Sequence, residues 1–356
     1  MRVFQLMPTI AAGDAVSNDA IAIGKVLKNM GLKTEIFAEN VDKHLPSGTA
    51  SHISRMPRLT ANDTVLYHLS VGSELNFTLE KLKAKKGIIY HNITPSYFFR
   101  PYNGQLTELL DFGRKGAAHL ADKADFCMAD SEYNKKELIE LGYKCEIAVR
   151  PVLIQFTDYS GKPDPEVLRQ YDSDGYVNFL FVGRVAPNKK HEDVIRAFYC
   201  YKKYCNPKAR LIFVGSWQGT ELYYKRLLRY IDALELDDVI FTGHISFAKL
   251  IAYYQSADVF MCMSEHEGFC VPLLEAMYFG VPIVAYDACA VPDTLGDAGI
   301  LLHDKDPLTA AFAVNRLLTD TTLRREIIGR GRKRQQDFAY NTVKNKFEEQ
   351  LRGFLG

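Results

Sequence analysis

The chain has 356 residues, a formal net charge of +1 and a hydrophobic fraction of 47%. This length favours two domains, and a charge so close to zero gives no reason to expect a nucleic-acid partner. No apolar run approaches the roughly 20 residues of a membrane span, and the seven cysteines include no CxxC pair. The composition therefore favours a cytoplasmic globular protein with reduced, buried thiols, such as Cys127 and Cys262, rather than disulfides or a zinc site.

The first half of the chain alternates apolar runs with helical patterns. A loop of small residues at 9–18, which contains Gly13 and Asp14, separates the first strand from the first helix. Such a loop lets a phosphate or a sugar approach the backbone closely, but it is not a GxGxxG, so a plain turn is an equal alternative. Strands are expected at 2–7, 33–37, 64–68, 87–93 and 125–129, and helices at 18–30, 112–123 and 131–142.

Two histidines, His68 and His91, follow apolar runs of this half at the point where each expected strand ends. Parallel strands place ligands beyond their carboxyl ends, so both histidines are candidates for contact with a ligand. A structural role at a strand end is the alternative for each of them.

A polar stretch at 158–176, with two prolines and two glycines, is the expected domain boundary. We expect a first domain at 1–165 and a second at 166–339. The stretch contains Asp172-Ser173-Asp174, a DxD of the kind that holds a cation on a diphosphate in some enzymes. Here it precedes a strand instead of following one, so an ordinary turn is the preferred interpretation.

The second domain opens with an apolar run at 177–183 that is followed by Arg184 and Lys189. Two cations between a strand and a helix suit a diphosphate, because arginine can fork onto its oxygens. Two solvated loop charges are the alternative. Further strands are expected at 210–215, 239–243, 258–263, 281–286 and 299–302, and helices at 221–234, 246–257, 271–279, 307–318, 323–338 and 341–354.

One stretch of the second domain, residues 263–287, combines a strand end, a glycine-bearing loop, a helix and a second strand. The helix at 271–279 directs unpaired N–H groups at whatever lies beyond the strands, which favours an anion. Glu267 in the loop and Glu275 in the helix are separated by seven residues. Carboxylates beside a phosphate site bind hydroxyl groups, so the stretch indicates a ligand with phosphate in the middle and polyols at both ends. A nucleotide sugar has that shape.

Glu267 and Glu275, within EGFCVPLLEAMYFGVPIVA, resemble the signature of retaining glycosyltransferases of the GT-B fold, in the large group called family 4. The resemblance is specific from 182 to 298 and looser before 142. It implies an α/β fold with two Rossmann-like domains facing a central cleft. It also implies that the C-terminal helix, at 340–356, crosses back to pack on the first domain.

The resemblance also implies roles for individual residues. His91 matches a histidine that faces the donor sugar and is ranked above His68, while Arg184 and Lys189 match the cations that bind the diphosphate. The implied catalytic residues are His91, Arg184, Lys189 and Glu267. The implied donor-binding residues are Gly13, Gly183, Arg184, Lys189, His244, Ile245, Glu267, Gly268, Phe269, Cys270, Val271 and Glu275.

The expected reaction is the transfer of a hexose, with retention, from a GDP- or UDP-sugar to a glycan or lipid-linked acceptor in surface polysaccharide synthesis. Protein cations would stabilise the leaving phosphate, so neither a metal nor another cofactor is expected. A non-catalytic nucleotide-sugar binding subunit and a GT-B epimerase are the alternatives. Lysines at 81, 83, 85 and 86 could contact anionic lipid at the inner face of the plasma membrane, although a solvated helix face explains them too.

Overall fold

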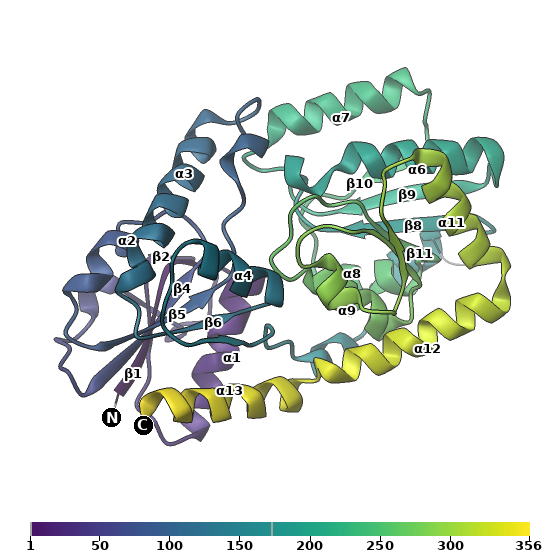
Figure 1. The fold of residues 1–356 in the computed structure, drawn as a ribbon. Helices are drawn as coiled ribbons and strands as arrows, with labels where there is room; N and C mark the ends of the chain where they lie inside the picture. Colours follow the sequence, from purple (N-terminus) through teal and green to yellow (C-terminus); the bar gives the residue numbers. More distant parts are fainter. Residues whose placement is uncertain (1, 172–173) are drawn as a thin grey trace. The chain divides into compact units, whose positions relative to one another are not determined.

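The computed structural model describes residues 2–171 and 174–356, and the chain divides into two compact α/β units (Figure 1). Unit 1 comprises residues 1–97, 105–154 and 338–356, and unit 2 comprises residues 98–104 and 155–337. The sequence placed the division after residue 165, whereas the second unit takes the chain from Gln155. The polar stretch begins in unit 2 because its own residues pack there: Asp164 donates its N–H to the carbonyl of Ala248.

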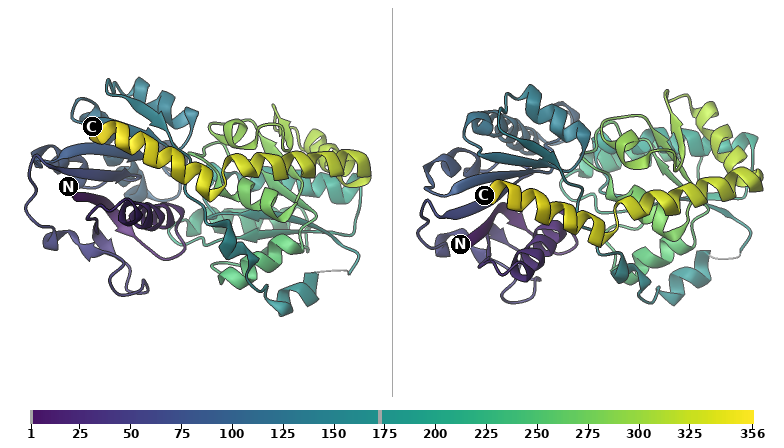
Figure 2. Two further views of the ribbon diagram at one scale, coloured as in Figure 1. Left: turned by 90° about the horizontal axis from the view of Figure 1, so that it is seen from below. Right: turned by 60° about the horizontal axis from the view of Figure 1, so that its bottom comes forward.

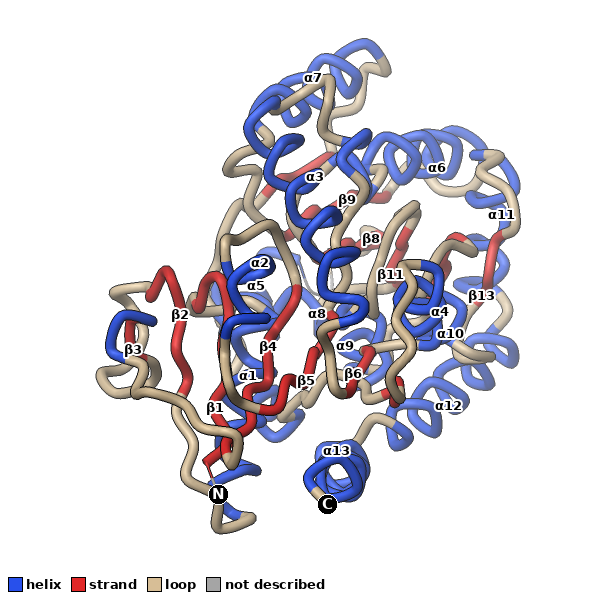
Figure 3. Tube along the Cα trace, turned by 60° about the vertical axis from the view of Figure 1, so that its left-hand side comes forward, coloured by secondary structure: helices blue, strands red, loops and turns tan. Residues whose placement is uncertain are grey.

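Unit 1 is built on a parallel sheet with the strand order β3-β2-β1-β4-β5-β6-β7 (Figure 3). The strands are β1 Arg2–Ile10, β2 Ile36–Val41, β3 Ser51–His52, β4 Asp63–Leu69, β5 Lys85–Tyr90, β6 Phe126–Ala129 and β7 Ile147–Val149. The helices are α1 Ala15–Asn29, α2 Leu75–Thr78, α3 Gly104–His119, α4 Glu132–Glu140 and α13 Tyr340–Leu355, with 3-10 turns at Ile53–Arg55, Leu79–Lys81, Ser96–Phe98 and Leu120–Asp122.

Unit 2 has a second parallel sheet, ordered β10-β9-β8-β11-β12-β13. Its strands are β8 Val177–Val182, β9 Ala209–Val214, β10 Val239–Phe241, β11 Val259–Cys262, β12 Ile283–Tyr286 and β13 Ile300–Leu302. Its helices are α5 Pro165–Tyr171, α6 His191–Tyr204, α7 Glu221–Ala233, α8 Phe247–Gln255, α9 Val271–Phe279, α10 Val291–Leu295, α11 Pro307–Thr319 and α12 Thr321–Asp337, with 3-10 turns at Phe156–Ser160 and Pro187–Lys189.

The last helix, α13, belongs to unit 1 and lies next to α1 (Figure 2). It buries Val343, Phe347 and Leu351 in one apolar cluster with residues of α1 such as Ile23 and Leu27. These three side chains follow one another at intervals of four residues, which places them on a single face of the helix. The packing of the C-terminal helix on the first Rossmann-like unit therefore follows from this apolar stripe.

The strand and helix pattern of the sequence is confirmed, with differences at several boundaries. The helix expected at 112–123 begins at Gly104, because its first two turns carry Leu106, Leu109 and Leu110 at helical spacing. The strand expected at 33–37 begins at Ile36. Of the DxD, Asp172 and Ser173 lie outside the described residues, while Asp174 is exposed and accepts a hydrogen bond from Arg210. No helix of the described chain has the length and apolarity needed to cross a bilayer.

Candidate functional site

In each sheet the strand order reverses at one place, and both reversals determine where polar groups collect. In unit 2 the chain moves outward from β8 through β9 to β10, then returns and continues from β11 to β13 on the other side. The connections that leave β8 and β11 therefore diverge and open a crevice at the carboxyl ends of these two strands. Arg184 and Lys189 follow β8, and Glu267 follows β11.

Lys189 and Glu267 are in direct contact in this crevice. The Lys189 Nζ atom lies 2.6 Å from both carboxylate oxygens of Glu267, and 22% of the lysine side chain is exposed against 8% of the glutamate. Burial lowers the pKa of Lys189, but the Glu267 carboxylate outweighs that effect, so the pKa is raised overall. Lys189 is therefore a fixed ammonium at the reversal point of the sheet.

The backbone of the two loops is also joined. Asn188 donates from Nδ2 to the carbonyl of His266 at 3.1 Å, and its own carbonyl accepts the N–H of Glu265 at 2.9 Å. Lys190 and Lys305 form ion pairs with Glu265 at 3.0 and 2.8 Å. The Asn188 and Lys190 contacts hold the loop after β8 against the loop after β11, and Lys305 holds Glu265 from the connection that follows β13.

The loop after β11 ends at Cys270, whose left-handed φ of 68° precedes the first turn of α9. The Cys270 side chain makes no capping hydrogen bond to that turn, and Val271 and Pro272 are its first residues. The N-terminal end of α9 thus directs backbone dipoles toward the crevice. Gly268 and Phe269 lie in the same loop, with Phe269 buried.

Glu275 lies one turn further along α9 and is buried. Both of its oxygens accept hydrogen bonds from tyrosine hydroxyls, one from Tyr159 and one from Tyr254 at 2.6 Å. Burial raises the pKa of Glu275, and the two hydroxyls oppose that rise. The sequence did not identify either tyrosine as a partner, because Tyr159 is 116 positions away from Glu275.

The remaining predicted residues of unit 2 lie around the same edge of the sheet. Arg184 is exposed, and its Nη2 donates to the carbonyl of Gln218 at 3.1 Å. A Cβ on Gly183 would lie 3.3 Å from the ring of Phe181, and a Cβ on Gly215, which follows β9, would lie 2.0 Å from the Gly183 oxygen. His244 is exposed and Ile245 is half-buried, and both lie in the connection from β10 to α8.

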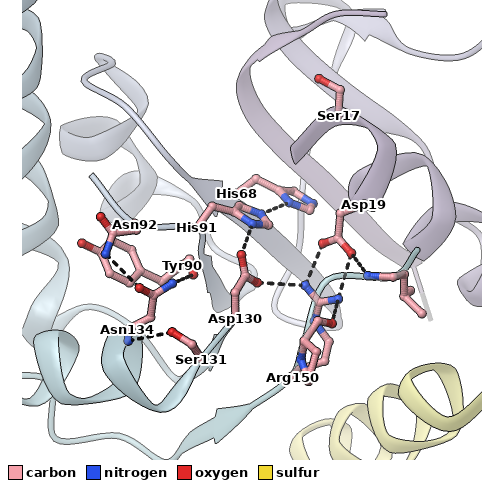
Figure 4. A network of polar contacts seen from close by, with 12 residues as sticks. Ser17, Asp19, His68, Tyr90, His91, Asn92, Asp130, Ser131, Asn134 and Arg150 are labelled. Atoms are coloured by element: carbon pink, nitrogen blue, oxygen red, sulfur yellow. Dashed lines mark hydrogen bonds and ion pairs between the residues drawn. The ribbon is translucent and has the colours of Figure 1, made fainter. Parts of the chain in front are cut away.

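Two predicted residues, Gly13 and His91, belong to unit 1. Gly13 has a φ of 76° in the turn after β1, directly before Asp14, which caps α1 by accepting the N–H of Ser17. His91 follows β5 and is the centre of a buried polar network (Figure 4). Its Nδ1 contacts Asp130 Oδ2 at 2.7 Å, and its Nε2 contacts His68 Nδ1 at 2.8 Å.

The network extends to groups that the sequence did not predict. Arg150, fully buried, forms two hydrogen bonds to the carboxylate of Asp19 at 2.9 and 2.7 Å and lies 3.4 Å from Asp130. Burial opposes ionisation of Asp19, yet the Arg150 charge outweighs it and the pKa of Asp19 is lowered. Asp130 and Arg150 directly follow the strands β6 and β7. A charged side chain that is buried there needs a partner, and this position is the signal that could have identified them.

Two groups among the described residues combine side chains that could bind a metal ion: Asp19 with His68 and His91, and Cys262 with Glu267 and Cys270. In each group the carboxylate already has a cationic partner, Arg150 in the first and Lys189 in the second. All seven cysteines are free thiols, and Cys127 and Cys262 are buried, as the sequence predicted.

Comparison with known proteins gives a match to a described family within unit 2. Residues 166–334 match the family model described as glycosyl transferases group 1, which covers most of that unit. Over 62% of the chain the sequence is 25% identical to O-antigen chain mannosyltransferase B of Escherichia coli, and over 44% it is 32% identical to a GDP-mannose-dependent alpha-mannosyltransferase of Mycolicibacterium smegmatis. The chain spans 58% and 39% of the length of these two relatives.

Solved structures with the same fold cover nearly the whole chain. The Anabaena protein HepE, solved in complex with UDP-glucose, superposes with a TM-score of 0.78 at 19% identity and covers 99% of this chain and 100% of its own. Sucrose-phosphate synthase of Thermosynechococcus elongatus gives a TM-score of 0.77 at 17% identity, with 99% of both chains covered. The α/β fold with two Rossmann-like units and a C-terminal helix, predicted as GT-B, is confirmed.

Proposed function

We propose that this chain is a glycosyltransferase that moves a hexose from a nucleotide sugar to a glycan or lipid-linked acceptor. The observation that carries the proposal is the Lys189–Glu267 ion pair at the strand reversal of unit 2, beside the N-terminal end of α9. An ammonium and a helix N-terminus bind a diphosphate, and a carboxylate beside them binds sugar hydroxyls.

Retention and independence from metal ions are parts of the same proposal. A double displacement with retention would require a carboxylate that acts as a nucleophile and forms a covalent intermediate. A route in which the leaving phosphate accepts the proton of the acceptor, on the same face of the sugar, needs no such nucleophile. Arg184 and Lys189 would stabilise the charge that develops on the phosphate, the role a divalent cation fills elsewhere.

The donor is proposed to be a GDP- or UDP-linked hexose, with GDP-mannose as the first to be tested. Two relatives are named as mannosyltransferases, one of them GDP-mannose-dependent and the other an O-antigen enzyme. These names also support an acceptor of the surface polysaccharide class. The HepE complex with UDP-glucose makes UDP-glucose the second donor to be tested.

The test is a panel of GDP-mannose, UDP-glucose and other nucleotide sugars, each incubated with the protein and a short mannoside or glucoside acceptor. Release of the nucleoside diphosphate measures turnover, and NMR of the product gives the anomeric configuration. We expect an α-linked product from an α-linked donor, in the presence and absence of EDTA. An inverted product would refute retention, and binding without turnover for every donor would favour a non-catalytic binding subunit.

A further inference from the structure

The rings of His68 and His91 meet edge to edge, so one hydrogen bond joins them. His68 lies in β4, where it pairs with Ile89 of the adjacent strand β5, and His91 directly follows β5 and donates its backbone N–H to the carbonyl of Leu69. The rings are nearly coplanar, with an interplanar angle of 3°, and His68 Nδ1 lies 2.8 Å from His91 Nε2. Because both atoms are ring nitrogens, one of them must carry the proton and the other must accept it.

The outer nitrogens of the pair determine which of the two carries that proton. His91 Nδ1 faces the Asp130 carboxylate at 2.7 Å, and a carboxylate accepts, so this nitrogen is protonated. His68 Nε2 faces the amide oxygen of Gln5 at 2.9 Å, so it is protonated too. A neutral His68 then has a bare Nδ1, which can only accept. His91 Nε2 must donate, and His91 is doubly protonated.

Charge balance in the buried network supports the same assignment. Asp19, Asp130 and Arg150 carry two negative charges and one positive charge, and all three are buried. A neutral His91 would leave this network with one uncompensated charge, which is costly in the interior of a protein. An imidazolium at His91 makes the network neutral.

The direction of titration agrees with this geometry. Burial works against a charged ring at His91, but Asp130 outweighs it and the pKa of His91 is raised. Burial, followed by the charge of His91, lowers the pKa of His68 well below its ordinary value. The titratable and charged groups that face His91 from the elements around it are His68 on β4, Asp19 on α1, Asp130 after β6 and Arg150 after β7.

We propose that His68 is a positioning residue that keeps His91 doubly protonated by offering it a bare ring nitrogen inside this closed network. The orientation of the Gln5 amide controls the arrangement. With its oxygen toward His68, as here, the pair holds the additional proton. With its NH2 group toward His68, the hydrogen bond between the rings reverses, and His91 gives up one proton to solvent. The second orientation is available because Gln5 Nε2 makes no hydrogen bond in the first.

The proposal has a direct test in the ring nitrogens themselves, which does not depend on any enzymatic activity. Histidine side-chain ¹⁵N spectra of the full-length protein, recorded as a function of pH, give the protonation state of His91, assigned by its loss in His91→Gln. We expect a doubly protonated ring above the usual imidazole range. His68→Leu leaves the buried N–H of His91 without an acceptor and should lower its pKa by about one to two pH units.

A matched variant separates the acceptor from the packing. His68→Asn removes the same ring but restores an oxygen close to the former Nδ1, so the pKa of His91 should return toward that of the wild type. His191→Leu removes an equally buried histidine of unit 2 and should leave His91 unchanged. If His68→Leu does not fold, Gln5→Leu carries the test, since it deletes the oxygen that keeps His68 Nδ1 bare. An unchanged His91 in both His68→Leu and Gln5→Leu would overturn the assignment.

The kinetic part of the inference rests on the proposed glycosyl transfer and is read separately. If His91 acts as an imidazolium, the alkaline limb of the kcat–pH profile should move to lower pH in His68→Leu and return in His68→Asn. If the pKa of His91 measured by ¹⁵N NMR changes in His68→Leu but the kcat–pH profile does not, the two histidines have a structural role only. Absence of transfer by the wild-type protein with every donor would refute the proposed function and leave the ¹⁵N result standing.

Discussion

The histidine at the start of α6 makes the stability of unit 2 sensitive to acid. His191 is fully buried between Phe181 and Phe213, with its ring centroid 4.8 Å from each of theirs, and neither of its ring nitrogens has a hydrogen-bond partner among the described residues. Burial, assisted by the charge of Lys189, lowers the pKa of His191 to about 3. The folded protein therefore keeps this ring neutral at pH values where the unfolded chain protonates it.

The size of the effect follows from the two pKa values. The group is depressed in the folded state, so its contribution to stability is complete above about pH 6.5 and is lost as the pH falls toward 3. At pH 5 protonation of this ring stabilises the unfolded chain by about 2 kcal/mol, which lowers the free energy of unfolding by the same amount. Near pH 3 the free energy of unfolding is lower by about 4 to 5 kcal/mol. His191→Phe should remove that loss, because phenylalanine cannot be protonated, and should keep an aromatic ring between Phe181 and Phe213. The backbone N–H of residue 191 can still donate to the Tyr223 hydroxyl.

The assay is urea unfolding of the wild type and of His191→Phe at pH 7.5, 6.5, 5.5 and 5.0, followed by far-UV circular dichroism. Comparison of the two proteins at each pH cancels the titration of the carboxylates, which both share, and the pH 7.5 value isolates any packing change. We expect the difference in free energy of unfolding between the variant and the wild type to increase by about 2 kcal/mol, in favour of the variant, from pH 7.5 to pH 5.0. If the free energies of unfolding of the two proteins changed in parallel with pH, the pKa of His191 would not be lowered in the folded protein, and the reasoning would be refuted.

Further predictions concern the candidate donor site. Lys189→Met should abolish measurable binding of GDP and UDP by calorimetry and also lower the melting temperature, because it leaves Glu267 buried without a counter-charge, a loss of about 3–5 kcal/mol. Arg184→Gln should weaken binding of the same nucleotides about tenfold with an unchanged melting temperature, since Arg184 is exposed. Glu275→Ala should weaken nucleotide binding by about 1.5–3 kcal/mol, and equal affinity in a folded variant would contradict a ribose contact. Turnover should survive EDTA, and rescue by manganese after complete loss would point to a metal site instead.

Much of the fold was predictable because buried parallel strands have a strong local signature. Runs such as 177–183 and 258–263 are almost entirely apolar, as strands covered on both faces must be. The boundary at Gln155 was not predictable in this way. The polar composition of 158–176 suggests a linker, but Asp164 and Val167 pack on unit 2, and such tertiary contacts leave no mark on local composition.

The candidate site was predictable only where a motif connects distant residues. Lys189 and Glu267 are 78 positions apart, and both are predicted as site residues by the family pattern and not by their spacing. No such pattern covered Asp19, Asp130 and Arg150, whose pairing spans up to 131 positions. The family pattern favours His91 over His68 and does not connect the two, whereas their mutual hydrogen bond arises from the pairing of β4 with β5.

The two candidate sites differ in how their charge is held, and this difference has a consequence for the order of events. In unit 1 the charges are enclosed and balanced among themselves, so a ligand has little to gain from them by direct contact. In unit 2 the Lys189 ammonium is still 22% exposed, and its partner Glu267 is the residue expected to bind the sugar. A diphosphate that attracts Lys189 also releases the oxygens of Glu267 for hydroxyl groups. Binding of the nucleotide portion would thus prepare the sugar contact, and a free hexose should bind measurably only when the nucleoside diphosphate is present.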